Sequence, residues 1–216
     1  MPLPKRSSAS STSNFADSRP SVTLRRVCVY CGANRGRDPA YAAAAQAMGR
    51  ALAVRGIGLV TGGGRVGLMG VVADAALDAG GEVTGVIPDA LMRKELAHTG
   101  LTELVVTASM HERKARMAEL ADGFVALPGG LGTYEELFEI WTWAQLGWHT
   151  KPCGLLNAAG FYDRLVAFLD GASEAQFLKP EHRAMLIVEG DPDRLLDRFD
   201  AYRAPTVAKW IGHDQT

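Results

Sequence analysis

The sequence lacks the features that mark several large classes of protein. Its 216 residues carry a formal net charge of -1, so no overall positive field favours binding to nucleic acid. No apolar run approaches the roughly 18 residues that span a bilayer. The serine-rich residues 1–20 contain no apolar segment of the kind found in secretory signals. We therefore expect no nucleic-acid partner, no membrane partner and a cytoplasmic location.

Cysteine is also scarce, and motifs of metal or serine hydrolases are missing. Three cysteines are too few for a disulfide framework, and an odd number favours a reducing compartment. Cys28 and Cys31 have the C-x-x-C spacing, but they lie in an apolar strand pattern that points them to opposite faces, and no second pair completes a zinc site. The sequence has neither H-E-x-x-H nor G-x-S-x-G. We expect structural cysteines, no metal and no cofactor.

Short apolar segments alternate with stretches of helical spacing. This alternation predicts βαβ units, and hence a single α/β domain with a doubly wound, mostly parallel sheet and helices on both faces. We expect the domain to span residues 24–204, after a disordered extension at 1–23 and before a tail at 205–216. The expected strands are 25–31, 57–60, 82–87, 104–107, 124–127 and 154–156; the expected helices are 39–55, 66–79, 109–121, one following residue 132, 161–169 and 193–202.

A glycine-rich turn joins the buried segment 124–127 to a helix. Bare amides at such a corner point towards one spot at the positive end of the helix dipole, which suits a phosphate. In the alternative interpretation, Thr133 and Glu136 form a capping box for the helix. The box alone leaves Gly129, Gly130 and Gly132 unexplained, because one glycine normally suffices for a turn.

A second glycine turn, at residues 62–67, satisfies the dinucleotide fingerprint G-x-G-x-x-G, and Glu82 follows at about the expected distance. A nicotinamide or flavin cofactor is therefore the strongest rival interpretation. Against it, the ribose-binding carboxylate belongs at the end of a strand, whereas Glu82 begins one. The fingerprint also normally follows the first strand, and here it follows the second.

Charged residues are expected near the same edge of the sheet. Ser109 is a plausible N-cap, and Arg113 and Lys114 follow just past the first helical turn. Such residues usually form a solvated face, but this helix also starts where a strand ends. Arg113 is then placed to hold a phosphate or carboxylate with two parallel hydrogen bonds. Glu95, on a neighbouring loop, is either a further polar contact or an exposed carboxylate.

Three segments together resemble the LONELY GUY family, the cytokinin riboside 5′-monophosphate phosphoribohydrolases, which have often been mislabelled as lysine decarboxylases. Residues 128–136 match PGGxGTxxE, residues 110–114 match MHxRK and residues 62–70 match GGGxxGLMG. The similarity runs from about residue 27 to residue 202. In one departure, Ala33 and Asn34 stand where family members commonly have serines, so a hydroxyl expected near the phosphate or ribose is missing.

The resemblance implies a Rossmann-like domain and a homodimer with the site near the subunit interface. It also implies hydrolysis of the N-glycosidic bond of an N6-modified adenosine 5′-monophosphate, such as isopentenyl-AMP, or of AMP itself, to free base and ribose 5-phosphate. By motif position, Arg113 and Glu136 become the catalytic pair. The residues expected to bind substrate are Gly63, Gly64, Glu95, Lys114, Gly130, Leu131, Gly132, Thr133, Tyr134, Glu135 and Thr142.

The proposed chemistry needs a carboxylate beside the sugar. Breaking an N-glycosidic bond develops positive charge on the ribose, and a carboxylate stabilises that charge and takes a proton from water. Glu136 is the candidate, one turn into the helix whose amides would hold the 5′-phosphate. Two other functions stay open: a nucleotide or pterin-phosphate carrier without turnover, and a pyridoxal phosphate-dependent decarboxylase. Lys114 lies beside the proposed anion site, but no independent feature marks it as the Schiff-base lysine that a decarboxylase needs. The sequence does not identify the N6 substituent or the group that protonates the base.

Overall fold

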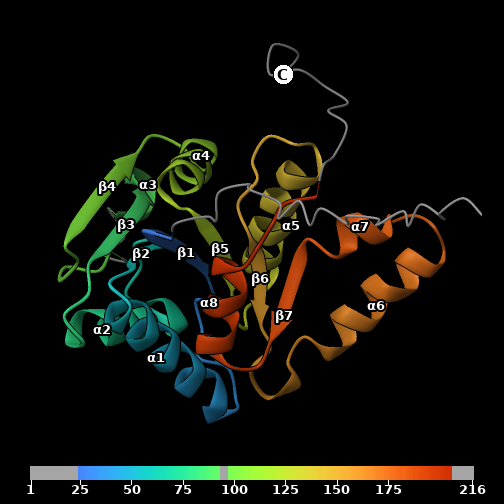
Figure 1. The fold of residues 1–216 in the computed structure, drawn as a ribbon. Helices are drawn as coiled ribbons and strands as arrows, with labels where there is room; N and C mark the ends of the chain where they lie inside the picture. Colours follow the sequence, from blue (N-terminus) through green and yellow to red (C-terminus); the bar gives the residue numbers. More distant parts are fainter. Residues whose placement is uncertain (1–23, 93–96, 206–216) are drawn as a thin grey trace, which may run out of the picture.

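The computed structural model describes residues 24–92 and 97–205 of the chain (Figure 1). The extension expected at 1–23 and all but the first residue of the expected tail lie outside these ranges. Glu95 also lies outside them, so its expected contact with substrate has no structural counterpart here. Within the described ranges, no helix is long and apolar enough to cross a membrane.

A seven-stranded sheet forms the centre of the fold, and all its pairs are parallel, as predicted (Figure 1). The strand order is β4-β3-β2-β1-β5-β6-β7. The strands are β1 (Arg26–Tyr30), β2 (Gly58–Thr61), β3 (Val83–Pro88), β4 (Glu103–Thr107), β5 (Gly123–Ala126), β6 (Cys153–Leu156) and β7 (Leu186–Glu189). The order reverses between β1 and β5, and ligands of doubly wound sheets bind at such a switch point.

The strand at the centre, β1, is paired on both sides. Cys28 lies opposite Val60 of β2 and opposite Phe124 of β5. All four residues of β5 are buried, as expected for a strand covered by helices on both faces. Its short apolar run therefore reflects two covered faces rather than one.

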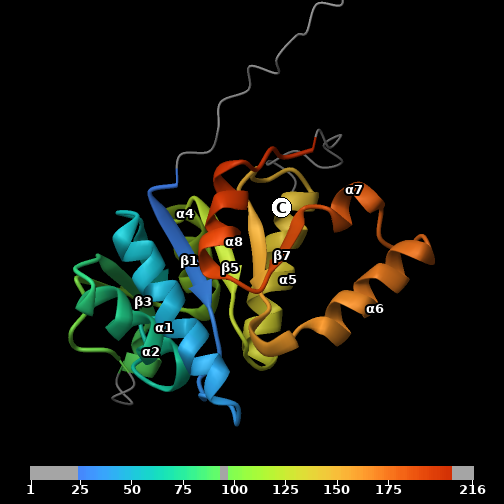
Figure 2. The same ribbon diagram turned by 60° about the horizontal axis from the view of Figure 1, so that its bottom comes forward.

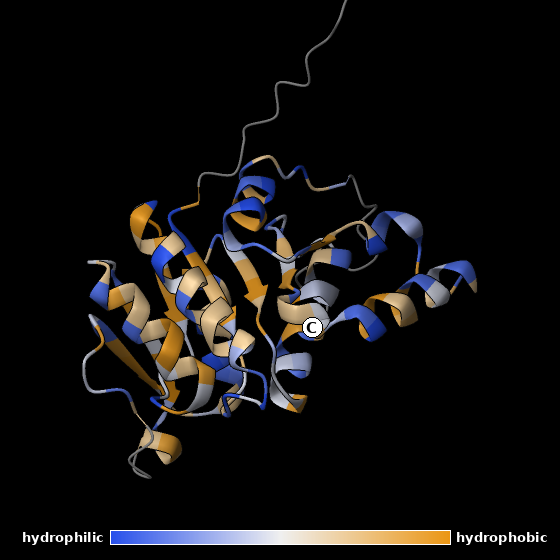
Figure 3. Ribbon diagram, turned by 90° about the horizontal axis from the view of Figure 1, so that it is seen from below, coloured by the Kyte–Doolittle hydropathy of each residue, from blue (hydrophilic) through white to orange (hydrophobic). Residues whose placement is uncertain are grey.

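One face of the sheet is covered by α1 (Pro39–Val54), α2 (Gly67–Asp78) and α8 (Pro192–Asp200) (Figure 2). Met48 and Leu52 of α1 and Phe199 of α8 belong to the same buried cluster as the side chains on this face of β1. The helices α1 and α2 approach so closely that a side chain at Gly49 would overlap the carbonyl oxygen of Val72. Figure 3 shows the strands largely in the colours of hydrophobic residues and the helices with mixed faces.

The other face carries α4 (Met110–Leu120), α5 (Leu131–Gln145) and α6 (Asp163–Glu174). Met117 of α4 and Leu137 of α5 are fully buried against Phe124 of β5. Trp141 of α5 donates a hydrogen bond of 3.1 Å from its indole to the carbonyl oxygen of His182. This bond ties α5 to the short helix α7 (Pro180–Arg183).

The boundaries expected from the sequence shift by a residue or two, and some elements were not predicted. The strand β7, the helices α3 (Asp89–Met92) and α7, and the 3-10 turn η1 (Ala158–Gly160) were missed, and α6 extends five residues beyond its expected end. The helices α3 and α7 have four residues each, which is too short to show the 3.6-residue period of a helix. The strand β7 pairs with β6, so its place comes from tertiary contacts rather than from local signals.

Candidate active site

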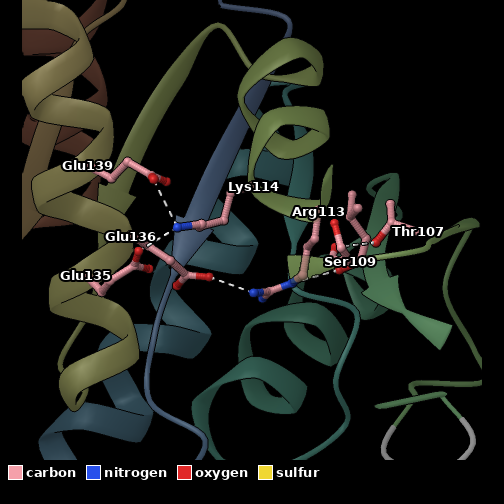
Figure 4. Close-up of polar contacts among 8 residues, drawn as sticks. Thr107, Ser109, Arg113, Lys114, Glu135, Glu136 and Glu139 are labelled. Carbon is pink, nitrogen blue, oxygen red and sulfur yellow. Dashed lines mark hydrogen bonds and ion pairs between the residues drawn. The ribbon is translucent and has the colours of Figure 1, made fainter. Parts of the chain in front are cut away.

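The helices α4 and α5 both start beyond the carboxyl ends of their preceding strands, and they bring an arginine and a glutamate together. Nη1 of Arg113 lies 2.9 Å from Oε1 of Glu136, and the two side chains are only 10% and 11% exposed (Figure 4). Ser109 is the N-cap of α4, accepting a 3.1 Å hydrogen bond from the amide of Glu112. The predictions of this cap and of a shared edge for Arg113 and the glycine turn are confirmed.

Arg113 is held from a second side. Its Nε donates a 3.1 Å hydrogen bond to the carbonyl oxygen of Val86 in β3. The alternative that Arg113 belongs to a solvated helix face is therefore wrong, because the whole residue is buried. A guanidinium fixed by two acceptors presents a preorganised positive charge to the cavity.

The protonation of Glu136 is set by opposing effects. Burial raises the pKa of the Glu136 carboxyl, and the charge and hydrogen bond of Arg113 lower it; the net result is a raised pKa. A general base works best when its pKa lies near the operating pH, and burial moves this carboxyl in that direction. The pair therefore combines a buried carboxyl, whose pKa is raised, with a neighbouring cation that opposes the rise.

The glycine turn before α5 is fixed by neighbouring elements. The hydroxyl of Tyr162 donates a 2.6 Å hydrogen bond to the carbonyl oxygen of Leu127. The amide of Gly32 donates a 3.0 Å hydrogen bond to the carbonyl oxygen of Pro128. A side chain at Gly129 would overlap Oγ1 of Thr133. The turn is thus held in one conformation before any ligand arrives.

The other two glycines of the turn face open space. A side chain built at Gly130 or Gly132 would meet no atom within 4 Å. Gly130 is the N-cap of α5, and no side chain caps the first amides of this helix. Uncapped amides at the positive end of a helix are suited to an anion, which supports the predicted phosphate position.

The capping-box interpretation is wrong. The helix begins at Leu131, so Thr133 is its third residue rather than its N-cap. Glu136 bonds Arg113 instead of a backbone amide at the helix start. The glycines allow the helix to begin at Leu131, three residues earlier than a threonine cap at position 133 requires, and the carboxylate is left available for chemistry.

A cavity of about 630 Å³ adjoins the ion pair and the glycine turn. Five of the expected site residues line it, namely Arg113, Gly130, Gly132, Thr133 and Glu136. Ala33 and Asn34, which stand in the place of the usual serines, also line it. Sequence reasoning did not identify the apolar and aromatic part of its wall, which consists of Tyr41, Leu68, Met69, Leu91, Met110 and Phe161.

The remaining expected site residues that the structure describes do not line this cavity. Lys114 contacts Glu135 and lies 3.0 Å from Glu139, in an ion-pair cluster beside the Arg113–Glu136 pair (Figure 4). The hydroxyl of Thr142 donates a 2.6 Å hydrogen bond to the carbonyl oxygen of Phe138, within its own helix.

Leu131 and Tyr134 of α5 also lie outside the cavity wall. Leu131 points outwards and is 86% exposed. The ring of Tyr134 packs edge-on against that of Tyr162, with centroids 6.4 Å apart. Both residues belong to the first turn of α5, directly after the glycine turn.

Two glycines of the second glycine turn, at residues 62–67, make backbone contacts with the segment that follows residue 96. The carbonyl oxygen of Gly63 accepts a 2.8 Å hydrogen bond from the amide of His98, and Gly64 forms an isolated bridge with Ala97. Glu82 lies immediately before β3, at the amino end of the strand, as expected. It is therefore at the edge opposite to the one where a dinucleotide ribose would need it.

The cysteines are structural, as predicted. Cys28, Cys31 and Cys153 are free and buried. Cys28 and Cys31 belong to the clusters on opposite faces of the sheet. Within residues 24–92 and 97–205, no group of three or more histidine, cysteine, aspartate or glutamate side chains is placed to hold a metal ion.

Comparison with known proteins gives the same family as the motifs. Residues 69–199 match the family model described as "Possible lysine decarboxylase". A cytokinin riboside 5′-monophosphate phosphoribohydrolase of Rhodococcoides fascians is 51% identical over 178 residues, covering 82% of this chain and 89% of the relative. A probable enzyme of the same name from Oryza sativa subsp. japonica is 47% identical over 179 residues, covering 83% of this chain and 72% of the relative.

Solved structures agree on the fold. The molybdenum cofactor binding protein from Rippkaea orientalis has a TM-score of 0.63 at 21% identity, covering 84% of this chain and 98% of that protein. At this identity the likeness extends to the fold alone. The motifs, the family model and the relatives near half identity together show that the chain belongs to the LONELY GUY family of cytokinin riboside 5′-monophosphate phosphoribohydrolases.

Proposed function

We propose that the protein hydrolyses the N-glycosidic bond of an adenosine 5′-monophosphate, releasing the free base and ribose 5-phosphate. The observation that carries this proposal is the buried Arg113–Glu136 pair in the wall of a cavity that also contains the uncapped start of α5. A carboxylate and an anion site in the wall of one cavity match the two ends of a ribose 5-phosphate. The names of the relatives point to the same reaction.

In this proposal, the 5′-phosphate binds at the start of α5. The amides following Gly130 donate to the phosphate oxygens, and Thr133 adds its hydroxyl. Binding the remote phosphate orients the sugar, so that its binding energy contributes to the reaction at the anomeric carbon. The open space around Gly130 and Gly132 allows oxygen atoms to approach the backbone closely.

Glu136 acts on the attacking water. As the bond between C1′ and the base nitrogen breaks, positive charge develops on the ribose, and the carboxylate stabilises it. The water oxygen forms the new bond to C1′, its proton passes to Glu136, and the departing base takes up a proton. Arg113 lowers the pKa of Glu136 against the larger effect of burial, and it offers a positive charge to the sugar or the base.

We propose AMP and isopentenyl-AMP as substrates. Met69, Leu91 and Met110 give one part of the cavity an apolar wall, and the rings of Tyr41 and Phe161 meet there edge-on at 5.4 Å. A wall of this kind accommodates an adenine ring and an apolar N6 group.

We also propose a homodimer with the site near the subunit interface, acting in the cytoplasm. Met110 and Leu131, at the start of the two catalytic helices, are 46% and 86% exposed. Exposed apolar residues beside a site favour a protein contact there. Three free, buried cysteines agree with a reducing compartment.

The test is to incubate the purified protein with AMP, isopentenyl-AMP and adenosine, and to measure free base and ribose 5-phosphate. We expect both nucleotides to be cleaved to equal amounts of the two products and adenosine to react far more slowly, because it lacks the phosphate. Binding of the nucleotides without release of base would refute the hydrolase and favour a carrier. A visible cofactor absorption band together with carbon dioxide release from lysine would instead favour a decarboxylase.

A further inference from the structure

Gly62 lies against the guanidinium of Arg113. A side chain built at Gly62 would overlap Nη2 of Arg113 and lie 3.2 Å from Cζ and 3.6 Å from Nε. These three atoms are the nearest ones to the added carbon, and all belong to Arg113. The space left by the missing side chain of Gly62 is therefore filled by one functional group.

The backbone does not require glycine at this position. Gly63 and Gly67 of the same turn have φ angles of 73° and 61°, in the left-handed region that favours glycine. Gly62 is not among the residues with positive φ in the described chain. An alanine at Gly62 is therefore not disfavoured by a positive φ, and the three atoms nearest to its added carbon all belong to the arginine.

The Arg113 guanidinium cannot move away from a methyl added at Gly62 without disturbing its hydrogen bonds. Its Nε is bonded to Val86 at 3.1 Å and its Nη1 to Glu136 at 2.9 Å. A planar group fixed at two corners moves as a unit. A methyl in the place of Nη2 must therefore shift the bond to Glu136, the bond to Val86, or both.

We propose that Gly62 is a positioning residue for the reaction, whose missing side chain creates the seat in which the Arg113 guanidinium is held against Glu136. The inference rests on the proposed function only for its effect on turnover. The seat itself is independent of any substrate. It gives the first glycine of the 62–67 turn a purpose other than binding phosphate or a dinucleotide.

The seat has an electrostatic consequence that does not depend on substrate. Arg113 lowers the pKa of Glu136 against the effect of burial. Moving the guanidinium away raises the pKa of the Glu136 carboxyl further. The other titratable groups that affect Glu136, or are affected by it, are Cys28, Tyr30, Cys31, Lys114 and Glu135, and Gly62→Ala leaves all of them in place.

The experiment compares Gly62→Ala, Arg113→Lys and the double variant with the wild type. A lysine lacks Nη2, so it does not reach the space that the methyl would fill. The matched control is Gly171→Ala, because Gly171 lies in α6 and an added side chain there meets no atom within 4 Å. The pKa of Glu136 is followed in ligand-free protein by the carboxyl ¹³C shift, and kcat and KM are measured with AMP.

In the wild-type background, we expect Gly62→Ala to raise the pKa of Glu136 and to lower kcat about 10²-fold, with a smaller change in KM. In the Arg113→Lys background, Gly62→Ala should change the acid dissociation constant of Glu136 by no more than about twofold. It should also change kcat/KM by no more than about twofold. Gly171→Ala should behave as the wild type in both backgrounds.

The proposal is overturned if Gly62→Ala leaves the pKa of Glu136 unchanged, or if its effect is equally large beside Lys at position 113. If Gly62→Ala alone does not fold, the double variant should fold, and an unfolded double variant would contradict the seat. A raised pKa of Glu136 in a protein that cleaves no AMP, even as the wild type, would uphold the seat while refuting the proposed function.

Discussion

Arg113 and Glu136 form an ion pair between two halves of the sheet. Arg113 stands on the helix that follows the edge strand β4, and Glu136 on the helix that follows β5, on the other side of β1. Their 2.9 Å contact joins α4 to α5, which follow strands on opposite sides of the point where the strand order reverses. The site therefore depends on both halves being in register.

Activity should depend on pH through Glu136. Because its folded-state pKa is raised, and because a base must be ionised, kcat/KM should fall as the pH is lowered through that raised pKa. Arg113→Gln removes the charge that lowers this pKa, so the acidic limb of the pH profile should move to higher pH. Profiles of kcat/KM against pH for the two proteins make the comparison. An acidic limb at the same pH in both would show that Glu136 is not the titrating base.

Glu136→Gln should abolish catalysis while keeping the fold. The amide cannot accept the proton of water, and loss of a general base costs roughly 10²- to 10⁴-fold in rate. The amide oxygen still accepts from Arg113, so the melting temperature should change little. Glu139→Gln is the matched control, because Glu139 is on the same helix but pairs with Lys114 outside the cavity. An equal loss of activity in both variants would remove Glu136 from its role.

Thr133→Val tests the phosphate contact. Valine keeps the shape that packs against Gly129 and removes only the hydroxyl. A hydrogen bond to a charged group contributes about 1.5–3 kcal/mol, so KM for AMP should rise by about 10- to 100-fold. The slow reaction of adenosine, which has no phosphate, should be unaffected. A large fall in melting temperature with an unchanged KM would instead indicate a purely structural threonine.

The cysteines should be inert in the native protein. Burial raises the pKa of the Cys153 thiol to about 12 and raises the pKa values of the Cys28 and Cys31 thiols further. We expect Ellman's reagent to titrate no thiol among these three until a denaturant is added. Rapid labelling of Cys28 or Cys31 in the folded state would reopen the redox interpretation of the C-x-x-C spacing.

Leu131→Asp should weaken the proposed homodimer. A charge on this exposed residue at the start of α5 opposes a dry contact beside the site. Size-exclusion chromatography with light scattering measures the mass of the assembly. Val54→Asp is the control, because Val54 is 81% exposed at the end of α1. A dimer that survives Leu131→Asp and dissociates with Val54→Asp would place the interface elsewhere.

The sequence predicts the site where two local rules coincide. Alternating strands and helices place the starts of α4 and α5 at one edge, and this was enough to bring Arg113 and Glu136 together. The direction of a side chain within a helix is harder to predict. Lys114, one residue beyond Arg113, points instead to Glu135 and Glu139.

Other parts of the site have no local signal. Tyr41 and Phe161 meet in the cavity wall although they are far apart in the sequence, and neither lies in a motif. The seat at Gly62 was also hidden, because a glycine turn suggests backbone conformation or phosphate binding before it suggests room for an arginine. Contacts between distant elements decide both features.

The central position of β1 has a consequence for synthesis on the ribosome. Cys28 of β1 lies opposite Val60 of β2 on one side and opposite Phe124 of β5 on the other. About half of the hydrogen-bonding groups of β1 therefore stay unpaired until β5 has been translated. A nascent chain that ends before Gly123 exposes this open edge of a buried apolar strand, where chaperones bind or aggregation begins. Enzymatic activity then cannot appear co-translationally before the segment bearing Glu136 has left the exit tunnel.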